Sequence, residues 1–321
     1  MPLLPRSTHL PRLATSLVAL LGTALSVGAC RFEEPRDDGQ GGAGGSGSGG
    51  ASEAAPLTVV TWNVHNLIND KLDADLEFED VDPDYDAHRV AVAKVIDELA
   101  ADVVVLQEVE HAKVLDELNQ ALAAPYPHQA LIEGNDPRGV DIAVLSRVAL
   151  DATVSHQDEK FTMQGTNAPL FTYARDCLEV RLTHNGRTIV LLGVHFKSKD
   201  NDNPDKRLAE AQHTRLIADA VQGNASDAGI LVLGDYNDLP GSLPVEAVAG
   251  SAPRFENAAD LVPSAERWSF DYNGKLELVD HQLASPLLFG MLDAGSPRIP
   301  HTKDVEAASD HAPIVATYLV R

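Results

Sequence analysis

Polar side chains that can bind a metal ion or exchange a proton follow several short apolar runs of this sequence. The runs end at Asn63, Glu108, His195 and Asp235, and Asn237 lies two places beyond the last of these. Carboxylate and amide oxygens suit hard divalent cations, and an imidazole exchanges protons near neutral pH. Any one of these residues could be an ordinary loop residue or a helix cap. Together they favour one shared site, because strands of one sheet can bring their ends to a common edge.

The apolar runs themselves predict strands that are buried on both faces, because their hydrophobic residues do not alternate cleanly with polar ones. The runs are 57–62, 102–107, 140–145, 188–194, 229–234, 276–284 and 313–320. Between some of them, apolar residues recur at the spacing of one helix face. These residues are Val92, Val95, Ile96 and Leu99, then Val114, Leu115, Leu118 and Leu122, and then Leu208, Ala211, Leu216 and Ala220.

The charge balance limits how such a site could hold a phosphate. The chain has 48 acidic and 25 basic residues, and its formal net charge is −23. Nucleic-acid-binding proteins usually carry a basic face, so phosphate chemistry here needs a local positive centre such as a bound metal ion. The plainer alternative is a soluble extracellular surface. Nine acidic residues lie between Asp70 and Asp86. They could hold structural calcium, although a solvated charge run is more common.

The N-terminus has the layout of an export signal. Basic residues within 6–12 precede an uncharged stretch over 13–29, which ends in small residues and then Cys30. This arrangement resembles a bacterial lipoprotein signal, in which Cys30 would be lipidated. A membrane-spanning helix and a plain secretory signal are the alternatives. The sequence GQGGAGGSGSGG over 39–50 is typical of a flexible coil.

We therefore expect a lipoprotein signal peptide over 1–30, a Gly/Ser-rich tether over 31–56 and one folded domain over 57–321. This organisation predicts an exported monomer that a lipid anchor holds at the outer membrane or the cell surface.

Seven segments of the domain carry a family resemblance, in the family's order and over nearly its whole length. They are TWNVHNL at 61–67, LQEVE at 106–110, VDIAVLSR at 140–147, VHFKSK at 194–199, GDYND at 234–238, LVDHQLAS at 278–285 and SDHAP at 309–313. Together they resemble the endonuclease/exonuclease/phosphatase (deoxyribonuclease I-like) superfamily. The resemblance implies an α/β fold (α+β in some schemes), a four-layered sandwich of two packed mixed β-sheets flanked by helices. It also implies a phosphoesterase that uses Mg²⁺, with Mn²⁺ or Ca²⁺ as possible substitutes.

The resemblance assigns metal binding and water activation to separate residues. Glu108 matches the principal metal-binding carboxylate, and Asn63 and Asp310 support it. Asp235 and Asn237 match the pair that orients the attacking water and holds the phosphate.

Two histidines receive roles at the scissile phosphate. His311 matches the histidine that contacts this phosphate, and Asp280 matches the carboxylate that orients it. A carboxylate partner favours the imidazolium form and so places positive charge beside the transition state. His195 resembles a second histidine that can serve as general acid, and Asp141 stands where the resemblance has its acidic partner. Arg175 resembles a phosphate-contacting arginine.

Substrate specificity is left open between two classes. Lys197, in HFKSK, resembles a substrate contact of secreted bacterial nucleases. Glu110, however, stands where the deoxyribonuclease branch has a basic phosphate contact, and Gly139 replaces a tyrosine used in the minor groove. We expect a metal-dependent extracytoplasmic nuclease or phosphodiesterase that acts on nucleic acid. The alternative substrates are lipid head groups, inositol phosphates or other small phosphoesters. A non-catalytic surface binding module would have lost ligands, and none of the principal ones is missing.

Overall fold

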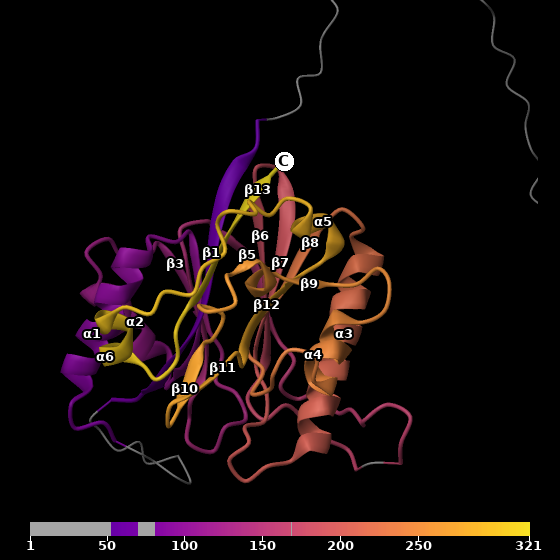
Figure 1. Ribbon diagram of the computed structural model, residues 1–321, viewed down its shortest axis with the longest axis horizontal. Coiled ribbons are helices and arrows are strands. Elements are labelled where there is room, and N and C mark those ends of the chain that lie inside the picture. The colour runs from indigo at the N-terminus through magenta and orange to yellow at the C-terminus, as the bar shows by residue number, and fades with distance from the viewer. Residues whose placement is uncertain (1–52, 70–80, 168) are drawn as a thin grey trace, which may run out of the picture. The chain divides into compact units, whose positions relative to one another are not determined.

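The computed structural model describes residues 53–69, 81–167 and 169–321, in which two β-sheets pack between two layers of helices (Figure 1). The expected signal peptide, Cys30 and most of the expected tether lie outside the described residues. Residues 70–80 of the acidic run also lie outside them. Among the described helices, none has the length and apolarity needed to cross a membrane.

One sheet has five strands and is mixed. Its strands, in spatial order, are β13 (Ile314–Val320), β1 (Ala55–Leu67), β2 (Val103–Val109), β4 (Asp141–Ser146) and β3 (His128–Leu131). β1 and β2 are parallel, and the other neighbours are antiparallel. The carboxyl ends of β1 and β2 therefore lie side by side, which places Asn63 and Glu108 at one edge.

The other sheet has six strands and is also mixed. Its strands, in spatial order, are β5 (Leu150–Ser155), β6 (Cys177–His184), β7 (Arg187–His195), β8 (Gly229–Asp235), β12 (Asp280–Ala284) and β9 (Glu256–Asn257). β7 and β8 are parallel and place His195 opposite Asp235, whereas antiparallel β12 begins with Asp280 opposite Asp235. Three potential site residues thus occupy neighbouring positions.

Helices cover the outer face of each sheet (Figure 1). α1 (Tyr85–Leu99), α2 (Ala112–Ala121) and α6 (Lys303–Ala308) pack on the five-stranded sheet. α3 (Pro204–Asn224) and α4 (Leu243–Ala249) pack on the six-stranded sheet. The short elements η1 (Ala258–Leu261), β10 (Phe270–Tyr272), β11 (Lys275–Glu277) and α5 (Pro286–Phe289) connect the strands.

Side chains on alternate positions of a strand build two different cores. Val104 and Leu106 of β2 pack toward the helices, whereas Val103 and Val105 pack into the layer between the sheets. Both faces of the strand are thus apolar, which explains the continuous hydrophobic runs. In this central layer, a Cβ on Gly193 would lie 2.9 Å from Ile142 Cγ2, so the sheets approach closely there. The four-layered α/β sandwich that the resemblance implied is confirmed.

The predicted apolar runs all form strands, although 276–284 divides into β11 and β12. β3, β5, β6, β9 and β10 were not predicted. β6 shows why, because it buries Leu178, Val180 and Leu182 while its neighbours Arg181 and Thr183 are exposed. An alternating strand of this kind lacks the continuous apolar run on which the prediction relied.

The three predicted helices are present, but the predicted face of α3 was only partly right, because Ala211 is buried whereas Ala220 is exposed. Leu216 is half-exposed, whereas Arg207 and Glu210 are buried. Both charged side chains are satisfied by hydrogen bonds to loops that α3 covers. A buried charge that is paired in this way is tolerated, and hydrophobic periodicity does not detect it.

The strands that lead to the site are bulged. The register shifts in β1 between Asn63 and Leu67, and in β2 between Gln107 and Val109. Within these bulges His65, Asn66 and Glu108 have positive φ angles of 55°, 52° and 67°. Such conformations are costly for residues other than glycine and are common at functional sites. The bulge redirects Glu108 at the point where an ordinary strand would continue its alternation.

Candidate active site

Four polar side chains meet where the two sheets abut. Asn63 Nδ2 donates a hydrogen bond of 3.1 Å to Asp235 Oδ2, which also lies 3.4 Å from His195 Nε2. Glu108 Oε1 lies 3.9 Å from the same nitrogen. Asn63 and Glu108 belong to the five-stranded sheet, whereas His195 and Asp235 belong to the six-stranded sheet. Packing of the two sheets therefore assembles this cluster.

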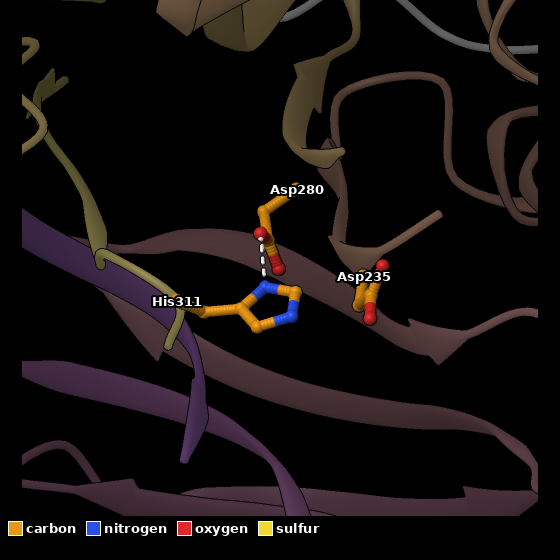
Figure 2. Close-up of side chains that lie close together, drawn as sticks. All are labelled: Asp235, Asp280 and His311. Atoms are coloured by element: carbon orange, nitrogen blue, oxygen red, sulfur yellow. Dashed lines mark hydrogen bonds and ion pairs between the residues drawn. The ribbon is translucent and has the colours of Figure 1, made fainter. Parts of the chain in front are cut away.

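Asp280 and His311 form a second pair close to Asp235 (Figure 2). His311 Nδ1 lies 2.7 Å from Asp280 Oδ2, and both side chains are buried. Burial disfavours the imidazolium, but the carboxylates of Asp280, Asp235 and Asp310 raise the pKa of His311 to about 10. His311 therefore supplies a positive charge at neutral pH.

Asp235 lies between the two groups, and its environment disfavours a second negative charge. Burial, followed by the charge of Asp280, raises the pKa of Asp235 to about 7, although the positive charge of His311 opposes this shift. Asp235 Oδ1 accepts the backbone N–H of Asn237 at 2.7 Å. A carboxyl group with this pKa can take or release a proton near neutral pH, as proton transfer from an attacking water requires.

Asp310 contacts a histidine, His65, that our sequence prediction did not include. His65 Nδ1 lies 2.9 Å from Asp310 Oδ1. The hydrogen bond to Asp310, and then the charges of Asp310 and Glu108, raise the pKa of His65. His65 thus senses the charges of two carboxylates, Glu108 and Asp310, that lie far apart in the sequence. The sequence feature that could have identified His65 is its position inside the segment WNVHN.

The donor set around Glu108 fits a hard divalent cation. Glu108 Oε2 accepts the backbone N–H of Asn66 at 2.8 Å, whereas Oε1 hydrogen-bonds no described residue and faces His195. Asp310, which contacts His65, and Asn63, which contacts Asp235, add oxygen donors of the kind that Mg²⁺, Mn²⁺ or Ca²⁺ prefer. Asn63 Oδ1 also accepts the backbone N–H of His65. A metal ion bound at this oxygen would therefore share it with that hydrogen bond.

A different trio has the closest-spaced ligand atoms among the described residues. One atom each of Asp235, Asp280 and His311 lie within 4.8 Å of one another. We do not favour this trio as the metal site, because hard divalent cations prefer oxygen ligands and His311 Nδ1 is already hydrogen-bonded to Asp280 Oδ2. The raised pKa of His311 makes it a cationic partner instead.

The residues that the sequence analysis expected to contact the phosphate come from loops. Asn237 has a positive φ of 52°, and its Nδ2 donates to the carbonyl of Phe196 at 3.1 Å. Arg175 Nη1 donates to the same carbonyl at 3.3 Å. Lys197 Nζ instead donates to the carbonyl of Asp200 at 2.6 Å, so its ammonium group is turned into its own loop. Asn237 and Arg175 thus share a backbone anchor beside His195, and Lys197 does not.

The pair expected between Asp141 and His195 is not formed. Asp141 Oδ1 accepts the backbone N–H of Gly134 at 2.7 Å, and His195 Nδ1 has no hydrogen-bond partner among the described residues. A Cβ at position 134 would lie only 3.0 Å from Asp141 Oδ1, so the loop backbone occupies the space beside this carboxylate. Burial raises the pKa of Asp141 to about 7.

His195 is held in the neutral form. Burial, followed by the charges of Arg175 and Arg138, lowers the pKa of His195 well below its usual value. A neutral imidazole does not have the extra proton that the expected general-acid role requires. This environment argues against that role and favours hydrogen bonding to Asp235.

α3 holds two loops of the site through a buried carboxylate that the sequence prediction missed. Glu210 accepts the backbone N–H groups of Ala174 and Lys197, each at 2.6 Å. One turn away, Arg207 Nη1 donates to the carbonyl of Lys197 at 3.0 Å, and Nε donates to Asp238 at 3.1 Å. The polar face of α3 therefore fixes the segments that carry Arg175 and Asn237.

A cavity of about 700 Å³ opens beside His65 and Asp310. Asp82, Asp84 and Glu306 also line it, and no lysine or arginine does so among the residues that the structure describes. Asp82 is already engaged with His88. The cavity opens next to Asp310, and the acidic residues of its described lining give it a negative character.

Comparison with known proteins agrees with this geometry. The sequence matches the Endonuclease/Exonuclease/phosphatase family over residues 60–311, so the chain belongs to this family. A truncated Caenorhabditis elegans TDP2 superposes with a TM-score of 0.58 at 16% identity, covering 83% of this chain and 98% of that one. An endonuclease/exonuclease/phosphatase family protein from Bacteroides thetaiotaomicron gives a TM-score of 0.59 at 15% identity, covering 84% and 97%. These likenesses show the fold.

One curated relative is more similar in sequence over a shorter region. The inositol phosphosphingolipids phospholipase C of Saccharomyces cerevisiae is 28% identical over 196 residues. The match covers 58% of this chain and 38% of the yeast protein, so the chain aligns with well under half of that relative.

Proposed function

We propose that the chain is a divalent-metal-dependent phosphodiesterase. The observation that carries this proposal is the meeting of Glu108 and Asn63 with His195 and Asp235 across the two sheets, beside the Asp280–His311 pair. Family membership supports hydrolysis of a phosphate ester.

Each residue group would have a distinct role in this reaction. Glu108, Asn63 and Asp310 would hold the ion, for which Mg²⁺ is our expectation. When bound, a divalent cation would polarise phosphoryl oxygens and stabilise the leaving oxygen. Asp235 orients the attacking water and accepts its proton, since its pKa is near 7.

We assign the two histidines roles that differ in part from those that the resemblance implied. His311, a cation next to Asp235, stabilises the negative charge that develops on the phosphoryl group. Neutral His195 orients Asp235 through its Nε2. Asn237 and Arg175 contact the phosphate from the loops.

Two substrate classes remain to be separated. Nucleic acid was the first expectation from the sequence. The acidic cavity beside Asp310, the net charge of −23 and the similarity to the yeast phospholipase C instead favour a small or lipid-linked phosphodiester with little further negative charge. We therefore propose lipid head groups or other small phosphodiesters as the main substrate class, and nucleic acid as the second.

A substrate panel tests the proposal. The purified protein would be incubated with plasmid, single-stranded DNA, RNA and vesicles that contain phosphodiester-linked head groups, each with Mg²⁺ and with a chelator. We expect Mg²⁺-dependent release from the vesicles, and a loss of several orders of magnitude in turnover in Asp235→Ala. Faster turnover of the nucleic acids would reverse our order of substrates. No metal-dependent turnover of any member would contradict the phosphodiesterase itself.

We also propose that the protein is an exported lipoprotein anchored through Cys30. The support is the signal-like N-terminus and the Gly/Ser-rich segment that follows it. Metabolic labelling with a radioactive fatty acid should label the wild type and not Cys30→Ser, and fractionation should move the variant out of the membrane. Equal labelling of both proteins would contradict the anchor.

A further inference from the structure

His88 of α1 contacts the backbone on the metal-binding side of the candidate active site. Its Nε2 lies 3.0 Å from the carbonyl oxygen of Val64 and 3.0 Å from that of Ala308. Carbonyl oxygens only accept hydrogen bonds, so Nε2 is the donor to both. One imidazole N–H is therefore shared between strand β1 and the last residue of helix α6.

The other ring nitrogen fixes the orientation of this imidazole. His88 Nδ1 lies 3.1 Å from Asp82 Oδ2, and Asp82 Oδ1 accepts the backbone N–H of Asp84 at 2.8 Å. The side chain of His88 is only 16% exposed. Because both ring nitrogens are engaged, the ring is held in one orientation and presents its Nε2 donor at a fixed point.

Each of the two carbonyls belongs to a segment that carries site residues. Val64 directly follows Asn63, and Ala308 is two residues before Asp310. The segments also contact each other, because Ser309 Oγ donates to the carbonyl of Asn63 at 2.8 Å. The shared imidazole N–H thus lies where the two segments meet.

The carbonyl of Val64 belongs to the strained bulge of β1. Its peptide bond leads into His65, and His65 and Asn66 have positive φ angles of 55° and 52°. Such conformations persist only where surrounding contacts hold them. A fixed donor on the Val64 carbonyl restrains the plane of this peptide bond. The restraint reaches the metal-binding carboxylate, because the backbone N–H of Asn66 donates to Glu108 Oε2 at 2.8 Å.

The carbonyl of Ala308 takes its donor from outside its own helix. The last carbonyls of a helix have no intrahelical partner, and a buried carbonyl without a donor is costly. His88 supplies this donor just ahead of Asp310. The end of α6, and with it the start of the 308–311 segment, is therefore fixed to α1.

We propose that His88 is a positioning residue, which holds the bulge of β1 and the 308–311 segment so that Asn63, Glu108 and Asp310 can share one metal ion. The proposal deepens the metal-dependent phosphodiesterase function and rests on it. His88 touches neither the ion nor the substrate in this role. It acts through the two backbone carbonyls.

A purely structural histidine makes a different prediction. His88 could serve only to fasten α1 to the sheet. In that case its replacement would lower the melting temperature and leave the affinity for metal unchanged.

The test uses variants that keep or remove the Nε2 donor. The amide nitrogen of a glutamine falls near the position of Nε2, whereas that of an asparagine falls near Nδ1. His88→Gln therefore keeps the donor to the carbonyls and His88→Asn removes it. Asp82→Asn is a milder variant, which keeps the donor and weakens the contact that orients the ring.

His184→Asn is the matched control. His184 Nε2 also lies 3.0 Å from a carbonyl oxygen of β1, that of Pro56, near the opposite end of the strand. This variant removes a histidine contact from the same strand far from the bulge.

Three measurements separate the two roles. Amide hydrogen exchange in chelator, followed for His65 and Asn66, reports on the bulge without metal or turnover. Electron paramagnetic resonance of free Mn²⁺ gives the Kd of the metal site. Initial rates on bis(p-nitrophenyl) phosphate with Mg²⁺ give kcat and KM.

We expect His88→Asn to exchange these two amides about tenfold faster and to raise the Mn²⁺ Kd at least about tenfold, as for other groups that support metal ligands. Its kcat should fall by more than its KM rises. His88→Gln should recover most of each loss, and Asp82→Asn should show a smaller change in the same direction. His184→Asn should match the wild type.

Wild-type amide exchange and Mn²⁺ affinity in His88→Asn would overturn the proposal, and so would equal losses in His88→Asn and His88→Gln. Should His88→Asn not fold, wild-type values in Asp82→Asn would overturn it. A wild type that binds no Mn²⁺ would contradict both this proposal and the proposed function. If Mn²⁺ binds as expected but no phosphodiester is turned over, the proposed function fails, and amide exchange and Mn²⁺ affinity still decide the role of His88.

Discussion

His311 Nδ1 and Asp280 Oδ2 lie 2.7 Å apart, and this contact joins the two sheets of the sandwich. Asp280 is the first residue of β12 in the six-stranded sheet. His311 lies three residues before Ile314, where β13 of the five-stranded sheet begins. Trp62 Nε1 of β1 donates to the carbonyl of His311 at 2.8 Å and so fixes its backbone. The charge of His311 therefore depends on correct packing of both sheets.

Replacing Asp280 should weaken turnover more than substrate binding. Asp280→Asn keeps the side-chain size but removes the negative charge that favours the imidazolium. We expect kcat to fall by about 100- to 1,000-fold with little change in KM, because the charge matters most in the transition state. Initial rates over a range of substrate concentrations give kcat and KM. Asp151→Asn, on the exposed edge strand β5, is the control and should retain full activity. A kcat like that of the wild type would contradict the role of the pair.

Stability should depend on the protonation of His311. Its pKa is raised from 6.5 to about 10 in the folded protein, so folding takes up a proton. The resulting stabilisation is fully present below pH 6.5 and is lost as the pH rises toward 10. We expect the difference in unfolding free energy between the wild type and His311→Gln to shrink over this range. Urea denaturation in chelator at pH 6, 8 and 10 measures it, and a constant difference would contradict the shift.

Metal binding should depend on Glu108. Mg²⁺ should raise the melting temperature of the wild type, because a ligand that binds only the folded state stabilises it. Glu108→Gln should lose most of this increase and need at least about tenfold more Mg²⁺ for half-maximal turnover. Thermal denaturation at several Mg²⁺ concentrations gives the first quantity. Glu98→Gln, on the exposed side of α1, should behave like the wild type. An undiminished Mg²⁺ effect in Glu108→Gln would place the ion elsewhere.

Glu210 should matter for both stability and substrate affinity. Burial raises the pKa of Glu210 to about 7, so at pH 8 both oxygens can accept the backbone N–H groups of Ala174 and Lys197. A glutamine has one oxygen, and Glu210→Gln therefore leaves one N–H without an acceptor. We expect a loss of about 1–3 kcal/mol in unfolding free energy and a raised KM. The exposed helix variant Asp219→Asn controls for α3 itself, and equal stability of the two variants would contradict this role.

The sequence was informative where a polar residue able to bind a metal or exchange a proton follows an apolar run. Asn63 follows the apolar part of β1, and His195 and Asp235 end β7 and β8. Parallel pairing of β1 with β2 and of β7 with β8 brings such positions together. The four-layered fold was an implication of the family resemblance that these motifs carry. These features are local, because each requires only a strand and the residue that follows it.

Features that arise when distant segments approach could not be read in the same way. Asp141 and His195 were expected to pair, but the backbone at Gly134 occupies the space beside the carboxylate. Glu210 has no apolar periodicity to mark it, since its burial depends on two backbone N–H groups from other loops. Charged residues whose partners are backbone groups leave no pattern along the chain.

The close approach of the sheets at Gly193 means that activity also depends on residues of the hydrophobic interior. Gly193 is two residues from His195, and any larger residue there would push against Ile142 and Val105 of the opposite sheet. The two halves of the active site would then separate by a fraction of an ångström while the protein stayed folded. Some inactivating variants should accordingly occur among small apolar residues far from any polar side chain. A screen for lost activity would detect these variants, whereas a screen for lost expression would miss them.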